Sequence, residues 1–120
     1  MRSVNQAWRG LLHVWKTEGH FQFHVLAGSI VLAAAWWQKL ARWEWLFLIY
    51  AIGSVIIAEV FNTAVELVVD LVQPNFHPLA GMAKDVAAGA VLVASLQSVL
   101  IGIGVFGPPL WRYVEVWTIR

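Results

Sequence analysis

The chain has 120 residues, of which 60% are hydrophobic and 12% are charged, and its formal net charge is +1. Charged residues make up about a quarter of an ordinary soluble domain, and a soluble domain of this size could not hide so much apolar surface. The composition therefore predicts an integral membrane protein, with residues 1–120 forming one domain. The small net charge argues against a nucleic-acid partner, and the lack of cysteine excludes disulfides and thiolate chemistry.

Residues 1–20 have a pattern of their own. Apolar side chains recur there at spacings of three and four, which places them on one face of a helix: Val4, Ala7, Trp8, Leu11, Leu12 and Trp15. The basic residues Arg2, Arg9 and Lys16 fall elsewhere on the same helix. The pattern predicts an amphipathic helix that lies on the membrane surface.

Three later segments are apolar over the roughly 20 residues that a membrane crossing requires. We predict spans at 21–40, over a similar length beginning at Trp45, and at 86–106. The third should end at Gly107-Pro108-Pro109, because a proline pair cannot continue the hydrogen bonding of a helix. Tryptophans gather at one set of span ends, as in an aromatic belt: Trp36, Trp37, Trp43, Trp45, Trp111 and Trp117. The predicted fold is all-α, with three transmembrane helices and an N-terminal surface helix.

The second span carries a stripe of polar side chains on its inner half. Glu59, Asn62, Glu66 and Asp70 follow one another at helical spacings and fall within a sector of roughly 80°. Charge at membrane depth is costly, so each of these residues is a candidate for a functional site. Glu59 should be shallowly buried, whereas Glu66 and Asp70 should reach the headgroups or water. The alternative for Asp70 is an ordinary hydrated helix end.

A second polar cluster opens the third span on the same side of the membrane. A turn-rich connector, Gln73 to Pro78, leads into Lys84 and Asp85, which we expect at a helix N-terminus. Side chains from both spans should therefore converge at one interface: Glu66, Asp70, Asn75, His77, Lys84 and Asp85. The alternative for Lys84 and Asp85 is a common membrane-edge pair. The small residues 87–90 indicate close packing against another helix.

Glu18 lies just before the first span and should face the same interface as Glu66. Two carboxylates together with phosphate oxygens are a typical way to hold Mg²⁺, although a plain surface position for Glu18 is the alternative. His13, His20 and His24 are assigned structural roles, because they lack a convincing pattern of metal ligands. The glycine-rich nucleotide motifs and the protein-kinase signatures are absent from the sequence.

Two long motifs carry a specific resemblance. Residues 59–70 follow E-x-x-N-T-A-x-E-x-x-V-D, and residues 77–91 follow H-P-L-A-x-x-A-K-D-x-A-A-G-A-V. Shorter matches, A-[FW]-R-G and T-E-x-x-F, precede them, so that the likeness covers residues 5 to about 100. The chain resembles the small prokaryotic diacylglycerol kinase and undecaprenol kinase family of integral membrane enzymes.

The resemblance implies a three-span homotrimer whose sites lie between neighbouring subunits. It further implies transfer of the γ-phosphate of Mg-ATP to a lipid hydroxyl, at the cytoplasmic face of the bacterial inner membrane. On this basis residues 1–120 form a single lipid kinase domain. Its partners are ATP, Mg²⁺ and a membrane lipid.

Site residues are carried over from the resemblance one by one. Glu59 matches the family's general base, Glu18 and Glu66 match its metal-holding carboxylates, and Asn62 matches a polar residue beside the reacting groups. Phosphoryl transfer depends on positioning and charge neutralisation, which agrees with this set of roles. A carboxylate near the hydrocarbon boundary is also well placed to accept a proton from a lipid hydroxyl.

The remaining matches concern the nucleotide. Lys84 and Asp85 match residues that contact the phosphates and the nucleotide, and Asn75, Phe76 and His77 fall where the connector meets it. Gln6 matches a nucleotide-proximal position on the surface helix. Gln22 stands where the family often has arginine, so one phosphate or substrate contact is missing.

The sequence of the second motif looks closer to the undecaprenol kinase branch of the family. The resemblance therefore favours undecaprenol as the acceptor, with diacylglycerol as the alternative. A small ion or proton channel is a remote alternative, because a conducting path needs polar residues through the whole bilayer. The outer halves of the spans offer few beyond Ser95, Gln97 and Ser98. A non-catalytic adaptor would leave the gathered carboxylates and Lys84 unexplained.

Overall fold

The computed structural model describes residues 2–119, which form helices α1 (Arg2–Thr17), α2 (Gly19–Trp37), α3 (Arg42–Val72) and α4 (Pro78–Thr118). These described residues contain no β-strand. The predicted all-α class is therefore confirmed, and the N-terminal segment is helical, as its apolar periodicity indicated.

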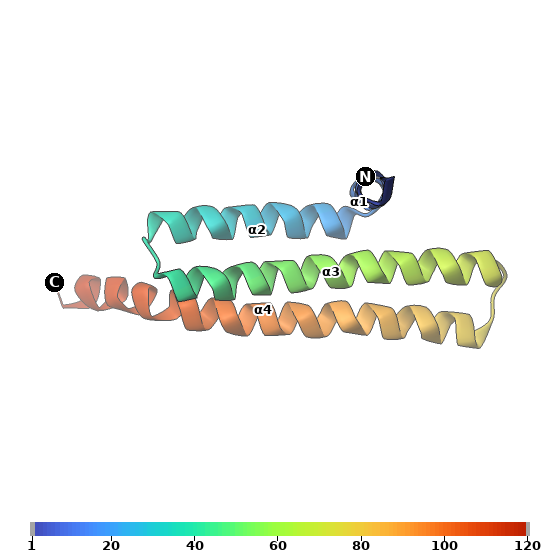
Figure 1. The fold of residues 1–120 in the computed structure, drawn as a ribbon. Coiled ribbons are helices and arrows are strands. Elements are labelled where there is room, and N and C mark those ends of the chain that lie inside the picture. The colour runs from blue at the N-terminus through green and yellow to red at the C-terminus, as the bar shows by residue number, and fades with distance from the viewer. Residues whose placement is uncertain (1, 120) are drawn as a thin grey trace.

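Helices α2, α3 and α4 lie side by side, with α3 in the middle (Figure 1). α3 and α4 form an antiparallel hairpin with the most extensive contact in the molecule, and α2 packs on α3. α1 lies across the bundle near the start of α2 and touches both α2 and α3. The molecule is elongated, 63 × 38 × 22 Å, and the α3–α4 connector lies at one end of its long axis.

The corner between α2 and α3 is closed by a residue in the left-handed conformation. Lys39 has a φ of 52°, and the N–H groups of Lys39 and Leu40 donate to the carbonyls of Trp36 and Ala35 at 3.2 and 3.4 Å. Leu40 also packs against the buried cluster that contains Ala35, which is the hydrophobic contact typical of this helix ending. The tight corner turns the chain so that α2 and α3 are antiparallel neighbours.

The prediction that Gly107-Pro108-Pro109 ends the third helix is wrong. α4 continues through both prolines to Thr118, and beyond them the Trp111 Nε1–H donates to Glu115 Oε1 at 2.7 Å. Proline lacks a backbone N–H, so each ring removes one hydrogen bond to the preceding turn. The residues after the pair have their own donors, and the helix can therefore resume.

Few side chains are buried within the single chain. A small cluster of Ala35, Leu48 and Val105 joins α2, α3 and α4, while large apolar side chains face outward along much of their length. An apolar surface this extensive needs a cover of lipid or other chains. Among the described helices, α4 alone is long and apolar enough to cross a membrane by length and composition. That α2 and α3 cross as well stays a prediction.

Gly28 of α2 is buried and comes close to α3. A Cβ at this position would lie 2.8 Å from Ile52 Cγ2 on α3, closer than real Cβ contacts come. The contacted atom is the β-branch of isoleucine, which cannot swing away without a change of rotamer. Glycine at residue 28 therefore lets the two helices approach at this point.

We expect Gly28→Ala to lower the thermal unfolding temperature of the detergent-solubilised protein. An added methyl in a packed contact costs about 1–3 kcal/mol, which exceeds the gain in helix propensity of up to about 1 kcal/mol. Gly53→Ala is the control, because a Cβ there meets nothing within 4 Å. Adding Ile52→Leu, which removes Cγ2, should restore the loss. Equal behaviour of the two alanine variants would contradict the close-approach explanation.

Candidate active site at the α3–α4 end

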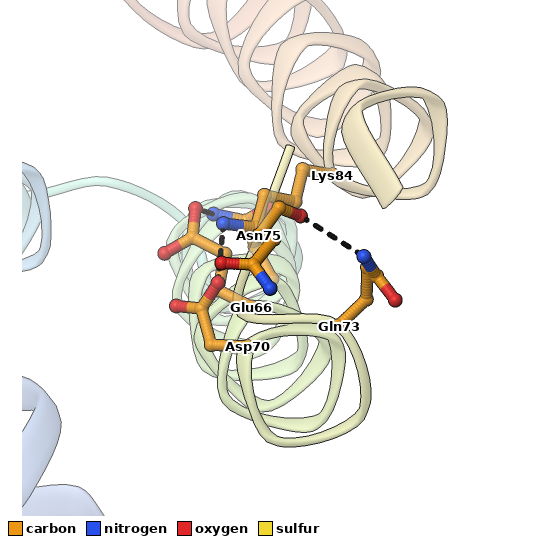
Figure 2. A network of polar contacts seen from close by, with 6 residues as sticks. Glu66, Asp70, Gln73, Asn75 and Lys84 are labelled. Carbon is orange, nitrogen blue, oxygen red and sulfur yellow. Dashed lines mark hydrogen bonds and ion pairs between the residues drawn. The ribbon is translucent and has the colours of Figure 1, made fainter. Parts of the chain in front are cut away.

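Polar side chains gather where α3 ends and α4 begins. Figure 2 shows Glu66 and Asp70 from α3, Gln73 and Asn75 from the connector, and Lys84 from α4 beside one another. The stripe on α3 and the first turns of α4 face each other because the two helices form a hairpin. The predicted convergence is thus observed for these residues, whereas their roles in chemistry stay predictions.

The shortest contact in the cluster joins the two helices. Lys84 Nζ donates to Asp70 Oδ1 at 2.6 Å, and the two side chains are 39% and 62% exposed. This hydrogen bond raises the pKa of Lys84, which lies ahead of the apolar segment 86–106, and nearby Glu66 acts in the same direction. Lys84 therefore remains a cation, available to a phosphate group that approaches from water.

One turn deeper, Asn62 and Glu66 are linked along α3. Asn62 Nδ2 donates to Glu66 Oε1 at 3.2 Å. The other end of the same amide, Asn62 Oδ1, is buried and has no hydrogen-bond partner within the described chain. A buried carbonyl oxygen without a partner is unusual. Together with the Glu66 carboxylate it leaves hard oxygen donors free at this depth.

Glu59 is the deepest carboxylate of the stripe and is 5% exposed. His24 Nε2, from α2, lies 3.4 Å from Glu59 Oε1, and the side chains are 24% and 7% exposed. The Thr63 hydroxyl donates to the Glu59 backbone carbonyl at 3.1 Å. The solvent exposure of the polar side chains therefore rises along about 16 Å of α3, from a buried carboxylate to an exposed ion pair.

The connector corrects the expected position of Lys84 and Asp85. α4 begins at Pro78, and His77 is its N-cap, with Nδ1 accepting from the Leu79 N–H at 3.1 Å. Lys84 and Asp85 thus lie in the second turn and later, not at the helix N-terminus. Sequence reasoning missed this start because proline, which usually interrupts helices, is well suited to their first position.

The rest of the connector is held loosely and lies open to solvent. Gln73 Nε2 donates to the Asn75 carbonyl at 3.3 Å (Figure 2). Phe76 is 94% exposed. An aromatic ring this exposed is free to contact a planar ligand.

Five predicted site residues have side chains that make no hydrogen bond or ion pair with the cluster within residues 2–119: Gln6, Glu18, Phe76, His77 and Asp85. The described residues also contain no group of three or more potential metal ligands. Gln22, which replaces the arginine frequent in the resembling family, instead donates to the Trp15 carbonyl at 2.6 Å and ties α2 to α1.

The structural role of His24 stays a prediction, and the structure adds a contact with Glu59 that the sequence did not indicate. The available signal was its place within an otherwise apolar span, where an ionisable side chain is costly and so suggests a function. Its partner could not be inferred, because 35 positions separate it from Glu59 in the sequence.

An all-helical chain with an outward-facing apolar surface and a charged cluster at one end defines a membrane protein with a site at the interface. Comparison with known proteins identifies its family. Residues 5–106 match the family model described as prokaryotic diacylglycerol kinase, and the chain belongs to that family. The protein is therefore a lipid kinase from a family of integral membrane proteins, and a kinase family implies ATP as the phosphate donor.

Individual relatives support the same assignment. The chain is 41% identical over 109 residues to an undecaprenol kinase of Bacillus subtilis, an alignment covering 91% of this chain and 89% of that protein. It is 39% identical to a diacylglycerol kinase of Synechocystis sp., over 90% of this chain and 62% of that protein. It is 31% identical to the diacylglycerol kinase of Escherichia coli (strain K12), over 83% and 82%.

We expect Asp70→Asn to be the mildest change along the stripe. The Asp70–Lys84 pair is exposed, and exposed ion pairs contribute little, so phosphate transfer should fall less than about fivefold. The thermal unfolding temperature should stay unchanged. Steady-state rates of this variant and of Glu59→Gln, measured in the same micelles, give the comparison. An equally deep loss in both would refute the ranking.

Proposed function

We propose that the protein transfers the γ-phosphate of ATP to the hydroxyl of a membrane lipid, with undecaprenol as the favoured acceptor and undecaprenyl phosphate as the product. The alternative acceptor is diacylglycerol, which would yield phosphatidic acid. The observation that carries the proposal is the graded stripe on α3. A buried carboxylate, Glu59, lies about 10 Å along the helix from Glu66, and the exposed Lys84–Asp70 pair lies beyond it. A lipid hydroxyl and a water-soluble nucleotide can meet only across such a gradient.

In this proposal Glu59 is the general base. Its depth matches a hydroxyl that stays near the hydrocarbon boundary, whereas the nucleotide enters from water. As the acceptor oxygen attacks phosphorus, the proton of the hydroxyl passes to the Glu59 carboxylate, and ADP leaves on the opposite side. The burial of Glu59 keeps water, the competing acceptor, away from the reacting oxygen.

Glu18 and Glu66 are proposed to hold Mg²⁺. Magnesium prefers hard oxygen ligands and commonly binds through one or two carboxylates together with substrate phosphates. The donors at Glu66 fit that preference, because its carboxylate adjoins the unpartnered Oδ1 of Asn62. When bound, the ion supplies positive charge against the phosphate oxygens.

The exposed end of the site is proposed to bind the nucleotide. Lys84 is a cation beside the two α3 carboxylates, and it can exchange Asp70 for a phosphate oxygen. Asp85, Gln6, Asn75 and His77 are proposed to contact the nucleotide, and the exposed ring of Phe76 offers it a flat apolar surface.

We propose a homotrimer with sites shared between subunits, each subunit crossing the inner membrane three times and carrying α1 on the cytoplasmic surface. The described residues form no group of three or more potential metal ligands, so a metal site that includes Glu18 and Glu66 would be completed by rearrangement or by a neighbouring subunit. The small residues 87–90 are also left without a packing partner within the described chain. Nothing lies within 4 Å of a Cβ built at Gly89, while Ala88 and Ala90 are exposed. A neighbouring helix would cover this face.

The acceptor is tested by transfer from γ-labelled ATP to undecaprenol and to diacylglycerol, each presented in matched micelles. The relative with 41% identity is an undecaprenol kinase and two with 39% and 31% are diacylglycerol kinases, so both lipids must be compared. We expect a higher kcat/KM with undecaprenol. A clear preference for diacylglycerol would replace the favoured acceptor, and no transfer to either lipid would overturn the proposal.

We predict that Glu59→Gln folds and binds Mg-ATP but loses phosphate transfer by roughly 10²–10⁴-fold, the usual contribution of general-base catalysis. Glutamine retains the size of the side chain and cannot accept the proton. Nucleotide binding is measured by equilibrium titration and transfer by single-turnover kinetics. Turnover close to that of the unmodified protein would exclude Glu59 as the base.

We predict that Glu18→Gln and Glu66→Gln each raise the Mg²⁺ concentration required for half-maximal activity. Because both carboxylates are assigned to one ion, the double variant should be little worse than either single variant. Activity is titrated against Mg²⁺ at fixed ATP, with Glu44→Gln at the opposite end of α3 as the control. Independent, multiplying losses would mean that the two residues do not share a metal.

A further inference from the structure

The carboxylate of Glu59, on α3, contacts a side chain of α2. Among residues 2–119, His24 of α2 is the ion-pair partner of this buried group, with Nε2 at 3.4 Å from Oε1. This separation exceeds an ordinary hydrogen bond. Catalytic contacts of substrate-free enzymes are often long and tighten when the reactants bind.

The crossing of α2 and α3 places His24 at this point. Gly28 on α2 lies close to Ile52 on α3. His24 lies one turn before Gly28, and Glu59 lies two turns after Ile52, so both pairs share a helix face. Because the helices are antiparallel, moving back about 6 Å along α2 and forward about 10 Å along α3 leads toward the same end of the bundle (Figure 1). The close approach at Gly28 and the contact of His24 with Glu59 therefore lie on the same side of the α2–α3 contact.

Apart from Glu59, the surroundings of His24 give no structural reason for a polar side chain. It borders a cavity of about 370 Å³ whose other lining residues are apolar or small, apart from Ser95 and Ser98. The Phe23 ring packs edge-on against the imidazole, with centroids 5.5 Å apart. An aliphatic residue would fill the same space without the cost of desolvating an imidazole.

We propose that His24 is a positioning residue for Glu59. Its Nε2–H donates to Oε1 and fixes the carboxylate, so that Oε2 faces the acceptor hydroxyl. The last torsion of a glutamate side chain is broad, and a base must be held in reach of the proton that it takes. The inference rests on the proposed role of Glu59 as general base and adds the group that orients it.

The test compares His24→Leu with His24→Gln in the full-length protein in lipid micelles. Leucine removes the donor, and the Gln amide can replace Nε2–H. A hydrogen bond to a charged group corresponds to roughly a 10–100-fold effect, so His24→Leu should lower kcat by that factor and leave the KM for Mg-ATP within about twofold. His24→Gln should recover most of the rate. His20→Leu, the same substitution one turn earlier at an exposed position, should match the unmodified protein.

A double-mutant cycle separates positioning from general packing. If His24 acts through the Glu59 carboxylate, His24→Leu should cause no further loss in the Glu59→Gln background. Multiplying losses, an unchanged rate in His24→Leu, or equal losses in the Leu and Gln variants would each overturn the inference. Full activity of Glu59→Gln would instead refute the general base itself. Helicity and unfolding temperature of every variant confirm that the compared proteins are folded.

Discussion

The site depends on the unbroken helical path of α3. This helix runs 31 residues from Arg42 to Val72, and no proline interrupts it. An uninterrupted helix keeps a fixed angle of about 100° per residue, so polar side chains at suitable spacings stay on one face from the buried Glu59 to the exposed Asp70. α4 returns along the same face and adds Lys84. A break anywhere between Glu59 and Asp70 would rotate part of the stripe away from the site.

The exposed apolar surface that leaves the chain sparsely packed also suits an enzyme that acts on a membrane lipid. The buried cluster within one chain is small, and most large apolar side chains are exposed. In water this would be unstable, whereas a lipid environment or neighbouring subunits can cover such a surface. In the proposed function, a carboxylate lies close to this apolar region and a cation lies in water. The burial of Glu59 and the exposure of Lys84 fit that proposal.

Two local expectations failed because they treated proline as a uniform signal. Pro108 and Pro109 lie within α4, and Pro78 begins it. Proline interrupts a helix only through its own missing donor and its ring, while at the first helical position it costs nothing. The histidine before Pro78 then caps the helix through its side chain. Which of these effects prevails depends on the neighbouring turns, and single-residue preferences do not include them.

The sequence by itself determined the helical class, the stripe on α3 and the family, because each follows from local spacing or from long motifs in continuous segments. It also determined that Glu66, Asp70, Asn75 and Lys84 come together, since a short connector forces two adjacent helices into a hairpin. Only the tertiary structure decided which residue of α2 faces Glu59. That pairing depends on how far two helices slide along one another, and Gly28 against Ile52 is one close contact between them. No periodicity within either helix encodes such a distance, because it arises from the shapes of two surfaces that meet only after folding.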